Sequence, residues 1–198
     1  MTRSKNDKAF MDYVREECNL YGVTCSLKQS ETVKSGGIEC SGWFSAYDRE
    51  LVVAAKRREA FEIFIHEYAH MTQWYNGNDL WDDGLIGMDA VERWLQGARI
   101  RNIDKHIAAI KDLELDNEKR AVQLIKDWDL SVDIPAYIRK ANAYIHFYNW
   151  MRITRRWSNP LNSPYKNPHV LAVMSDKFNM QYERLSKRVH AAFSAGKI

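Results

Sequence analysis

Residues 61–74, FEIFIHEYAHMTQW, place the strongest constraint on how this chain can fold. At about 100° per residue, one helical stripe of this segment is almost wholly apolar and consists of Phe61, Phe64, Ile65, Tyr68 and Thr72. His66, Glu67 and His70 fall on the opposite side of the same helix. We therefore expect a helix with one side in the core and the other at the floor of a pocket.

The polar side of this helix has the spacing HExxH. Two imidazoles one turn apart can reach the same ion, and neutral imidazole is a good zinc ligand. Glu67 is too displaced from His66 to be a third ligand, but its carboxylate can take a proton from a metal-held water that attacks a carbonyl. The spacing predicts a metal bound by His66 and His70, with Glu67 as general base. The competing interpretation is two surface histidines beside a solvated glutamate.

A third ligand must come from elsewhere, because a catalytic zinc usually takes three protein ligands. A helix expected over residues 104–128 has an apolar stripe whose middle is filled by Glu114 and Glu118. Two buried carboxylates one turn apart need positive charge or strong donors. We predict Glu114 as the third ligand and Glu118 as the acceptor for the far nitrogen of a zinc-bound histidine. The alternatives are swapped roles for this pair, Glu92 as the ligand, or a buried ion pair with a lysine or arginine.

Together these two segments resemble a known family. HEYAH followed by ELDNE resembles the gluzincin type of zincin metallopeptidase, although glutamate stands where that family more often has aspartate. HEYAH with ELDNEKRAVQLI is also similar to the small ImmA/IrrE-like zincins of bacteria and phages, over roughly residues 40–128. This resemblance implies a small sheet over the active-site helix, one zinc ion, and hydrolysis of a peptide or protein substrate.

The remaining periodicities predict an α+β fold that is mostly helical. Residues 6–20 have helical spacing, and residues 21–30, 37–48 and 49–56 read as three strands of a small mixed or antiparallel sheet, broken by Gly36-Gly37 and Asp48. Further helices are expected over residues 57–75, 89–98, 104–128, 133–157 and 175–193, with an acidic loop over 77–87. We expect a single zincin-like domain over residues 1–198, with the N-terminal sheet packed over the HExxH helix.

Three tyrosines share one face of the helix expected after Pro135, namely Tyr137, Tyr144 and Tyr148. Zincins commonly supply a tyrosine or histidine that stabilises the oxyanion formed on attack. We predict this role for Tyr144, with aromatic core packing as the alternative interpretation.

Composition and charge limit the classes of partner that this chain is expected to bind. A net charge of +3 is far from the basic stripe of a dedicated nucleic-acid binder. The arginines of residues 151–157, MRITRRW, suggest nucleic-acid binding, but arginines also suit a helix C-terminus, and we prefer that interpretation. A DNA-associated protease of the SprT kind is kept as an alternative, which the absence of a CxxC zinc module disfavours. With no long apolar run, we expect a cytosolic protein without a membrane partner. The three cysteines are expected to be buried free thiols.

The competing function is a zincin-fold regulatory or binding protein, DNA-associated in one version, that keeps its metal without turnover.

Overall fold

The computed structural model describes residues 4–35 and 38–198, and its fold is α+β and mostly helical, as predicted. The chain divides into two compact units. Unit 1 consists of Met1–Asn78 with Lys119–Asp133, and unit 2 consists of Asp79–Glu118 with Ile134–Ile198. The single domain expected over residues 1–198 stays a prediction.

Unit 1 contains both sheets and the HExxH helix. Its elements, in chain order, are α1 (Lys5–Leu20), β1 (Thr24–Lys28), β2 (Val33–Ser35), β3 (Ile38–Cys40), β4 (Gly42–Ser45), β5 (Glu50–Ala54) and α2 (Ala60–Tyr75). One sheet has the order β1-β5-β4, and β2 pairs with β3 in a second. Because β5 is parallel to β1 and antiparallel to β4, the larger sheet is mixed, as predicted.

The strands differ from the prediction in two respects. The single strand expected over residues 37–48 is two strands, β3 and β4, which belong to different sheets, and β2 was not predicted at all. The predicted break at Gly36-Gly37 lies outside the described residues. β5 is the central strand of the larger sheet and is almost entirely buried, which explains its uninterrupted apolar run Leu51, Val52, Val53 and Ala54.

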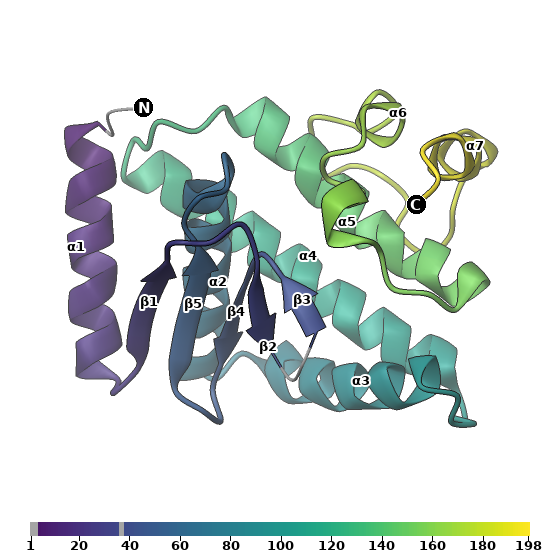
Figure 1. Cartoon of the computed structure of the whole chain (residues 1–198), viewed down its shortest axis with the longest axis horizontal. Coiled ribbons are helices and arrows are strands. Elements are labelled where there is room, and N and C mark those ends of the chain that lie inside the picture. The colour runs from purple at the N-terminus through teal and green to yellow at the C-terminus, as the bar shows by residue number, and fades with distance from the viewer. Residues whose placement is uncertain (1–3, 36–37) are drawn as a thin grey trace. The chain divides into compact units, whose positions relative to one another are not determined.

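Helix α2 packs against β4 and β5, so the small sheet lies over the HExxH helix as predicted (Figure 1). Phe64, Ile65 and Tyr68 are buried on its apolar side. The helix ends at Tyr75, and Gly77 just beyond it has a φ of +63°, which glycine adopts without steric cost. At Gly42 an added Cβ would lie 2.8 Å from the Ile63 side chain. The close approach of β4 to α2 therefore requires a glycine there.

The start of α1 is tied to the segment after α4 by Asp7, which is buried. Its carboxylate accepts hydrogen bonds from the Ser131 hydroxyl, from the Ser131 backbone N–H at 2.9 Å and from the Ser4 N–H at 3.1 Å. Burial by itself raises the pKa of Asp7, but the hydrogen bonds from Ser131 and Ser4 outweigh burial and hold that pKa below its ordinary value of 3.8.

We expect this carboxylate to make the stability of the protein depend on acid. Because the folded pKa of Asp7 is depressed, its contribution is present above pH 3.8 and is lost as the pH falls through the lower folded pKa. Asp7→Asn should lower the free energy of unfolding at pH 7 by about 1.5–3 kcal/mol, the usual worth of hydrogen bonds to a charged group. Urea unfolding of both proteins between pH 2.5 and 7 measures this. A difference between the two that does not shrink in acid would contradict it.

Unit 2 is built from helices. It contains α3 (Asp79–Leu95), the first part of α4 (Ile103–Asp127), α5 (Ile134–Thr154), a 3-10 turn η1 (Pro160–Asn162), α6 (Pro168–Leu171) and α7 (Lys187–Ala195). Its core includes Val91, Ile107, Phe147, Met151 and Phe193. The predictions of a long helix near 104–128 and of a buried helix after Asp133 are confirmed by α4 and α5. No helix among residues 4–35 and 38–198 has the length and apolar character needed to cross a membrane.

The acidic loop predicted over residues 77–87 is wrong, because α3 begins at Asp79 and is continuous to Leu95. The glycines that suggested a loop are packing residues. An added Cβ at Gly84 would overlap the Leu113 side chain, and one at Gly87 would lie 2.7 Å from the backbone oxygen of His106. Small residues therefore let α3 lie close against α4 in unit 2. Two aspartates in the first turn of α3 suit the positive end of the helix dipole.

The final helix predicted over residues 175–193 is wrong in its first half, since α7 begins only after Ser186, whose hydroxyl caps it. The segment before it is bound to α5 by side-chain amides. Asn142 Nδ2 donates to the backbone oxygens of Ser175 and Lys177, and Asn149 Nδ2 donates to that of Tyr182. These bonds satisfy the carbonyls without a helix.

The three cysteines are free, as predicted, but only Cys18 is buried; Cys25 and Cys40 are half-buried.

Candidate metal centre

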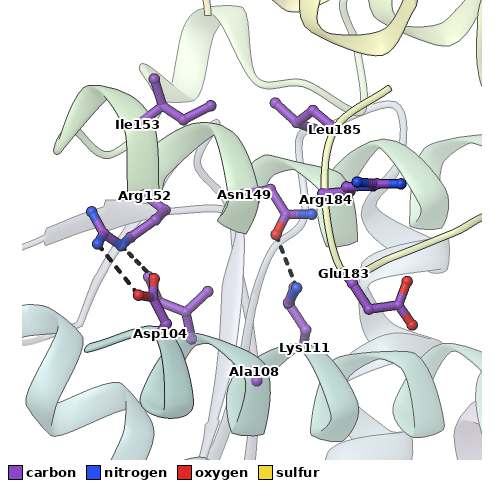
Figure 2. Close-up of a pocket in the computed structure, with 10 residues that line it drawn as sticks. Asp104, Ala108, Lys111, Asn149, Arg152, Ile153, Glu183, Arg184 and Leu185 are labelled. Atoms are coloured by element: carbon purple, nitrogen blue, oxygen red, sulfur yellow. Dashed lines mark hydrogen bonds and ion pairs between the residues drawn. The ribbon is translucent and has the colours of Figure 1, made fainter. Parts of the chain in front are cut away.

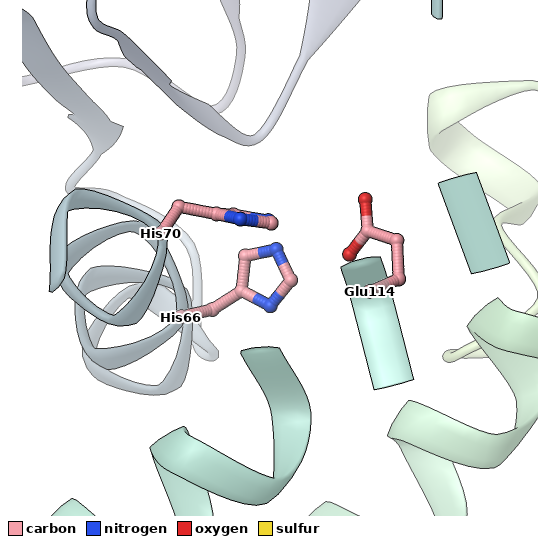
Figure 3. A group of neighbouring side chains, drawn as sticks. All are labelled: His66, His70 and Glu114. Atoms are coloured by element: carbon pink, nitrogen blue, oxygen red, sulfur yellow. The ribbon is translucent and has the colours of Figure 1, made fainter. Parts of the chain in front are cut away.

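Three side chains form a group that could hold a metal ion: His66 and His70 of α2 and Glu114 of α4 (Figure 3). Each offers one ligand atom, and these atoms all lie within 4.8 Å of one another. Neither Glu118 nor Glu92 belongs to the group. The three residues are those that the sequence predicts as ligands. Their role as ligands stays a prediction, since what is shown is a group able to take an ion.

The two histidines are held at fixed positions by α2. Their ring centroids lie 4.7 Å apart with planes at 88°, as expected one helical turn apart. His70 Nδ1 lies 2.9 Å from Oε1 of Gln73, which is completely buried. Since an amide oxygen only accepts, this hydrogen bond requires the tautomer with the proton on Nδ1, which would leave Nε2 of His70 for an ion. Sequence reasoning missed Gln73, although its place three residues after His70 on the same helix was a usable signal.

We expect Gln73→Leu to weaken metal binding by about 10–100-fold, the usual effect of removing a group that orients a ligating histidine. Gln73→Glu is the matched control, because a carboxylate oxygen can accept the same hydrogen bond. Competition with a chromophoric chelator would give both affinities. Equal affinities for the leucine and glutamate variants would show that the bond from His70 does not matter.

Glu114 is buried and is contacted by a tyrosine of α5. The Tyr148 hydroxyl donates to Glu114 Oε1 at 3.3 Å and lies 3.1 Å from the Tyr144 hydroxyl. Burial first, and then the neighbouring Tyr144 and Glu114, raise the pKa of Tyr148 well above its ordinary value. Tyr148 therefore keeps its proton and acts as a hydrogen-bond donor. Tyr144 is linked to Glu114 through the hydroxyl of Tyr148. Its predicted role in stabilising an oxyanion stays a prediction.

Glu118 is also held by a tyrosine of α5, one that lies nearer the start of that helix than Tyr148. The Tyr137 hydroxyl donates to Glu118 Oε2 at 2.6 Å. The two carboxylates, one turn apart on α4, thus each receive a hydrogen bond from a buried tyrosine of α5. This explains how both can lie on the buried side of α4. The predicted bond between Glu118 and a metal-bound histidine stays a prediction.

Glu67 is buried, with 7% of its surface exposed. The close approach of β4 to α2 also brings the Glu67 carboxylate near Gly42. An added Cβ at Gly42 would lie 3.3 Å from Glu67 Oε1. A buried carboxylate next in sequence to His66 argues against the interpretation of a solvated glutamate on a helix surface. Its role as general base stays a prediction.

Two arginines of the MRITRRW segment have local partners in unit 2. Arg152 pairs with Asp104 at 2.6 Å, and Arg155 donates to the backbone oxygen of Trp94 at 2.6 and 2.9 Å. His146 is buried, and burial together with Lys111 lowers its pKa to about 4. These contacts account for two of the arginines in MRITRRW as structural residues. Compared with known proteins, the chain matches no family model, no curated protein and no solved structure.

Proposed function

We propose that this chain is a zinc-dependent metallopeptidase in which His66, His70 and Glu114 hold the zinc and Glu67 is the general base. The observation that carries the proposal is the grouping of two imidazoles and one carboxylate from α2 and α4 within 4.8 Å. The burial of Glu67, the residue directly after His66, adds a carboxylate that a purely structural site has no use for.

The donor set fits zinc. Two histidines and a glutamate are the ligands of one well-known class of catalytic zinc sites, which keep a further position open for water or substrate. Calcium and magnesium prefer sets made of oxygen atoms. Two histidines with one carboxylate also bind non-haem iron, but the HExxH spacing and the buried Glu67 favour hydrolysis. Metal analysis separates the two ions directly.

The chain's own residues would divide the chemistry as follows. A zinc ion held by His66, His70 and Glu114 would supply a water whose pKa is lowered to about 7 and would polarise the substrate carbonyl. Glu67 takes the proton of the attacking water and delivers it to the leaving amine. Gln73 keeps the His70 ring in one tautomer, and Tyr148 holds Glu114. Tyr144 is the proposed donor to the oxygen that gains negative charge.

The test is metal content and turnover of the same preparation, purified without chelator. We expect close to one zinc per chain and hydrolysis of casein or of a peptide library. Dialysis against 1,10-phenanthroline should remove both, and one equivalent of zinc should restore both. Zinc without any turnover would support the competing binding or regulatory protein, and absence of zinc would contradict both.

A further inference from the structure

A pocket of about 370 Å³ lies in unit 2, lined by α4, α5 and residues 183–185 (Figure 2). Its size falls in the range of small-molecule sites, roughly 300–1,000 Å³. No member of the metal group lines it. The pocket is therefore a separate feature, independent of the proposed peptidase activity.

A buried ammonium group lines this pocket. Lys111 is only 8% exposed, and its Nζ donates to Asn149 Oδ1 at 2.9 Å (Figure 2). The same Nζ also donates to the backbone oxygen of Tyr182 at 2.8 Å. An ammonium carries three N–H donors, so these two acceptors leave one. Asn149 uses one amide N–H on the same Tyr182 oxygen, at 2.9 Å, which leaves its second N–H. Two neighbouring residues that line the pocket thus each retain one donor.

Burying this charge is unfavourable, and nothing in its hydrogen bonds neutralises it. Both acceptors of Lys111 are neutral oxygens. Burial lowers the pKa of Lys111, and the carboxylates of Asp112, Glu183 and Asp104 raise it in part. Of these, Asp104 is already paired with Arg152. An anion in the pocket would supply the charge that the buried ammonium lacks.

The rest of the lining favours an anion with an apolar body. Its cations are Lys111, Arg152 and Arg184, against the carboxylates of Asp104 and Glu183. Because Arg152 and Asp104 form an ion pair and offset each other's charge, the positive groups Lys111 and Arg184 remain beside one negative group, Glu183. The walls between them are apolar and consist of Ile107, Ala108, Ile153 and Leu185.

We propose that this pocket binds a small ligand bearing one carboxylate, whose two oxygens accept hydrogen bonds from Lys111 and Asn149 and whose apolar body packs against Ile107 and Ile153. The two donors that Lys111 and Asn149 retain match the two oxygens of a carboxylate. A phosphate has three terminal oxygens and would leave part of its hydrogen-bonding capacity unmet. Such a carboxylate belongs either to a free organic acid or to the C-terminus of a peptide with an apolar last residue.

Isothermal titration with hexanoate, hexylamine and hexanol tests the charge requirement. Hexanoate should bind at least tenfold more tightly than the other two, which have the same apolar chain. Lys111→Met should weaken hexanoate binding at least tenfold. Lys105→Met, an exposed lysine on the same helix, should leave it unchanged. Equal binding of all three probes would overturn the proposal.

Two further experiments complete the test. One keeps it valid if Lys111→Met does not fold, and the other asks whether the ligand is a free acid or a peptide terminus. Ala108→Phe fills the pocket without touching the bonds of Lys111, so it should abolish hexanoate binding even if Lys111→Met does not fold. Retained binding in Ala108→Phe would overturn the proposal. A tripeptide ending in leucine, with a free or an amidated C-terminus, replaces hexanoate in the last arm. Tighter binding of the free form than of hexanoate assigns the site to peptide termini, and the reverse assigns it to free acids; no binding of either probe overturns it.

Discussion

Replacing Glu67 with glutamine is expected to lower kcat/KM for peptide hydrolysis by about 10²–10⁴-fold and to leave the bound zinc in place. Glutamine keeps the size of the side chain but cannot take a proton from the attacking water. Glu67 is not a member of the metal group, so the ligands are unchanged. Casein or peptide turnover and zinc content, measured on the same preparation, check both parts.

Glu92→Gln is the matched control for this variant, because it makes the same change at an exposed carboxylate of α3. It should retain both activity and zinc. Loss of zinc from Glu67→Gln would make Glu67 a ligand and remove its assignment as base. Full activity with full zinc would mean that another group accepts the proton.

The second large effect is expected at Glu114. Glu114→Gln should weaken zinc binding by more than the roughly 10–100-fold typical of residues that only orient a ligand, and activity should fall with it. A neutral amide is a poor replacement for a carboxylate ligand of zinc. The Tyr148 hydroxyl can still donate to the remaining amide oxygen, so the fold around α4 should tolerate the change. Zinc retained after dialysis, together with chelator competition, measures the loss.

Two control variants locate the third ligand. Glu118→Gln should lose affinity only to the extent of a supporting residue, and Glu92→Gln should lose none. If Glu118→Gln or Glu92→Gln loses its zinc while Glu114→Gln keeps it, the ligand moves to that residue. Thermal unfolding of the zinc-free proteins separates a damaged fold from a damaged site, since a ligand change should leave the zinc-free melting temperature within a few degrees of wild type.

Much of the candidate site could be predicted from the sequence because its main members obey helical periodicity. The two histidines one turn apart define a shared face of α2, and the paired Glu114 and Glu118 interrupt an apolar stripe of α4. Both patterns are local, so a single sequence contains them. From the sequence, Tyr148 is only one of three tyrosines on the same face of its helix. Which of the three reaches Glu114 depends on how α5 runs along α4, and helical spacing says nothing about that.

The wrong predictions for residues 77–87 and 175–193 share one cause, which is that residues with strong local preferences are used here for contacts distant in sequence. Gly84 and Gly87 look like breaks, yet they lie inside α3 where it meets Leu113 and His106 of α4. Periodicity predicts a helix over residues 175–186, yet Asn142 and Asn149 of α5 bind backbone carbonyls of this segment instead. Glycine and asparagine have uses in packing that a local rule cannot separate from their uses in turns.

What the sequence by itself determined are the features that repeat with the period of a helix: the position of α2, the side of α2 that carries His66, Glu67 and His70, and the burial of the carboxylates of α4. Only the tertiary structure decided that Glu114, and not Glu118 or Glu92, joins the two histidines in one group. It also decided that Gln73 and Tyr148 hold members of that group in place. The physical reason is that periodicity specifies the direction of a side chain about its own helix axis, whereas a metal site needs atoms of different helices within a few ångströms, and packing alone sets that distance.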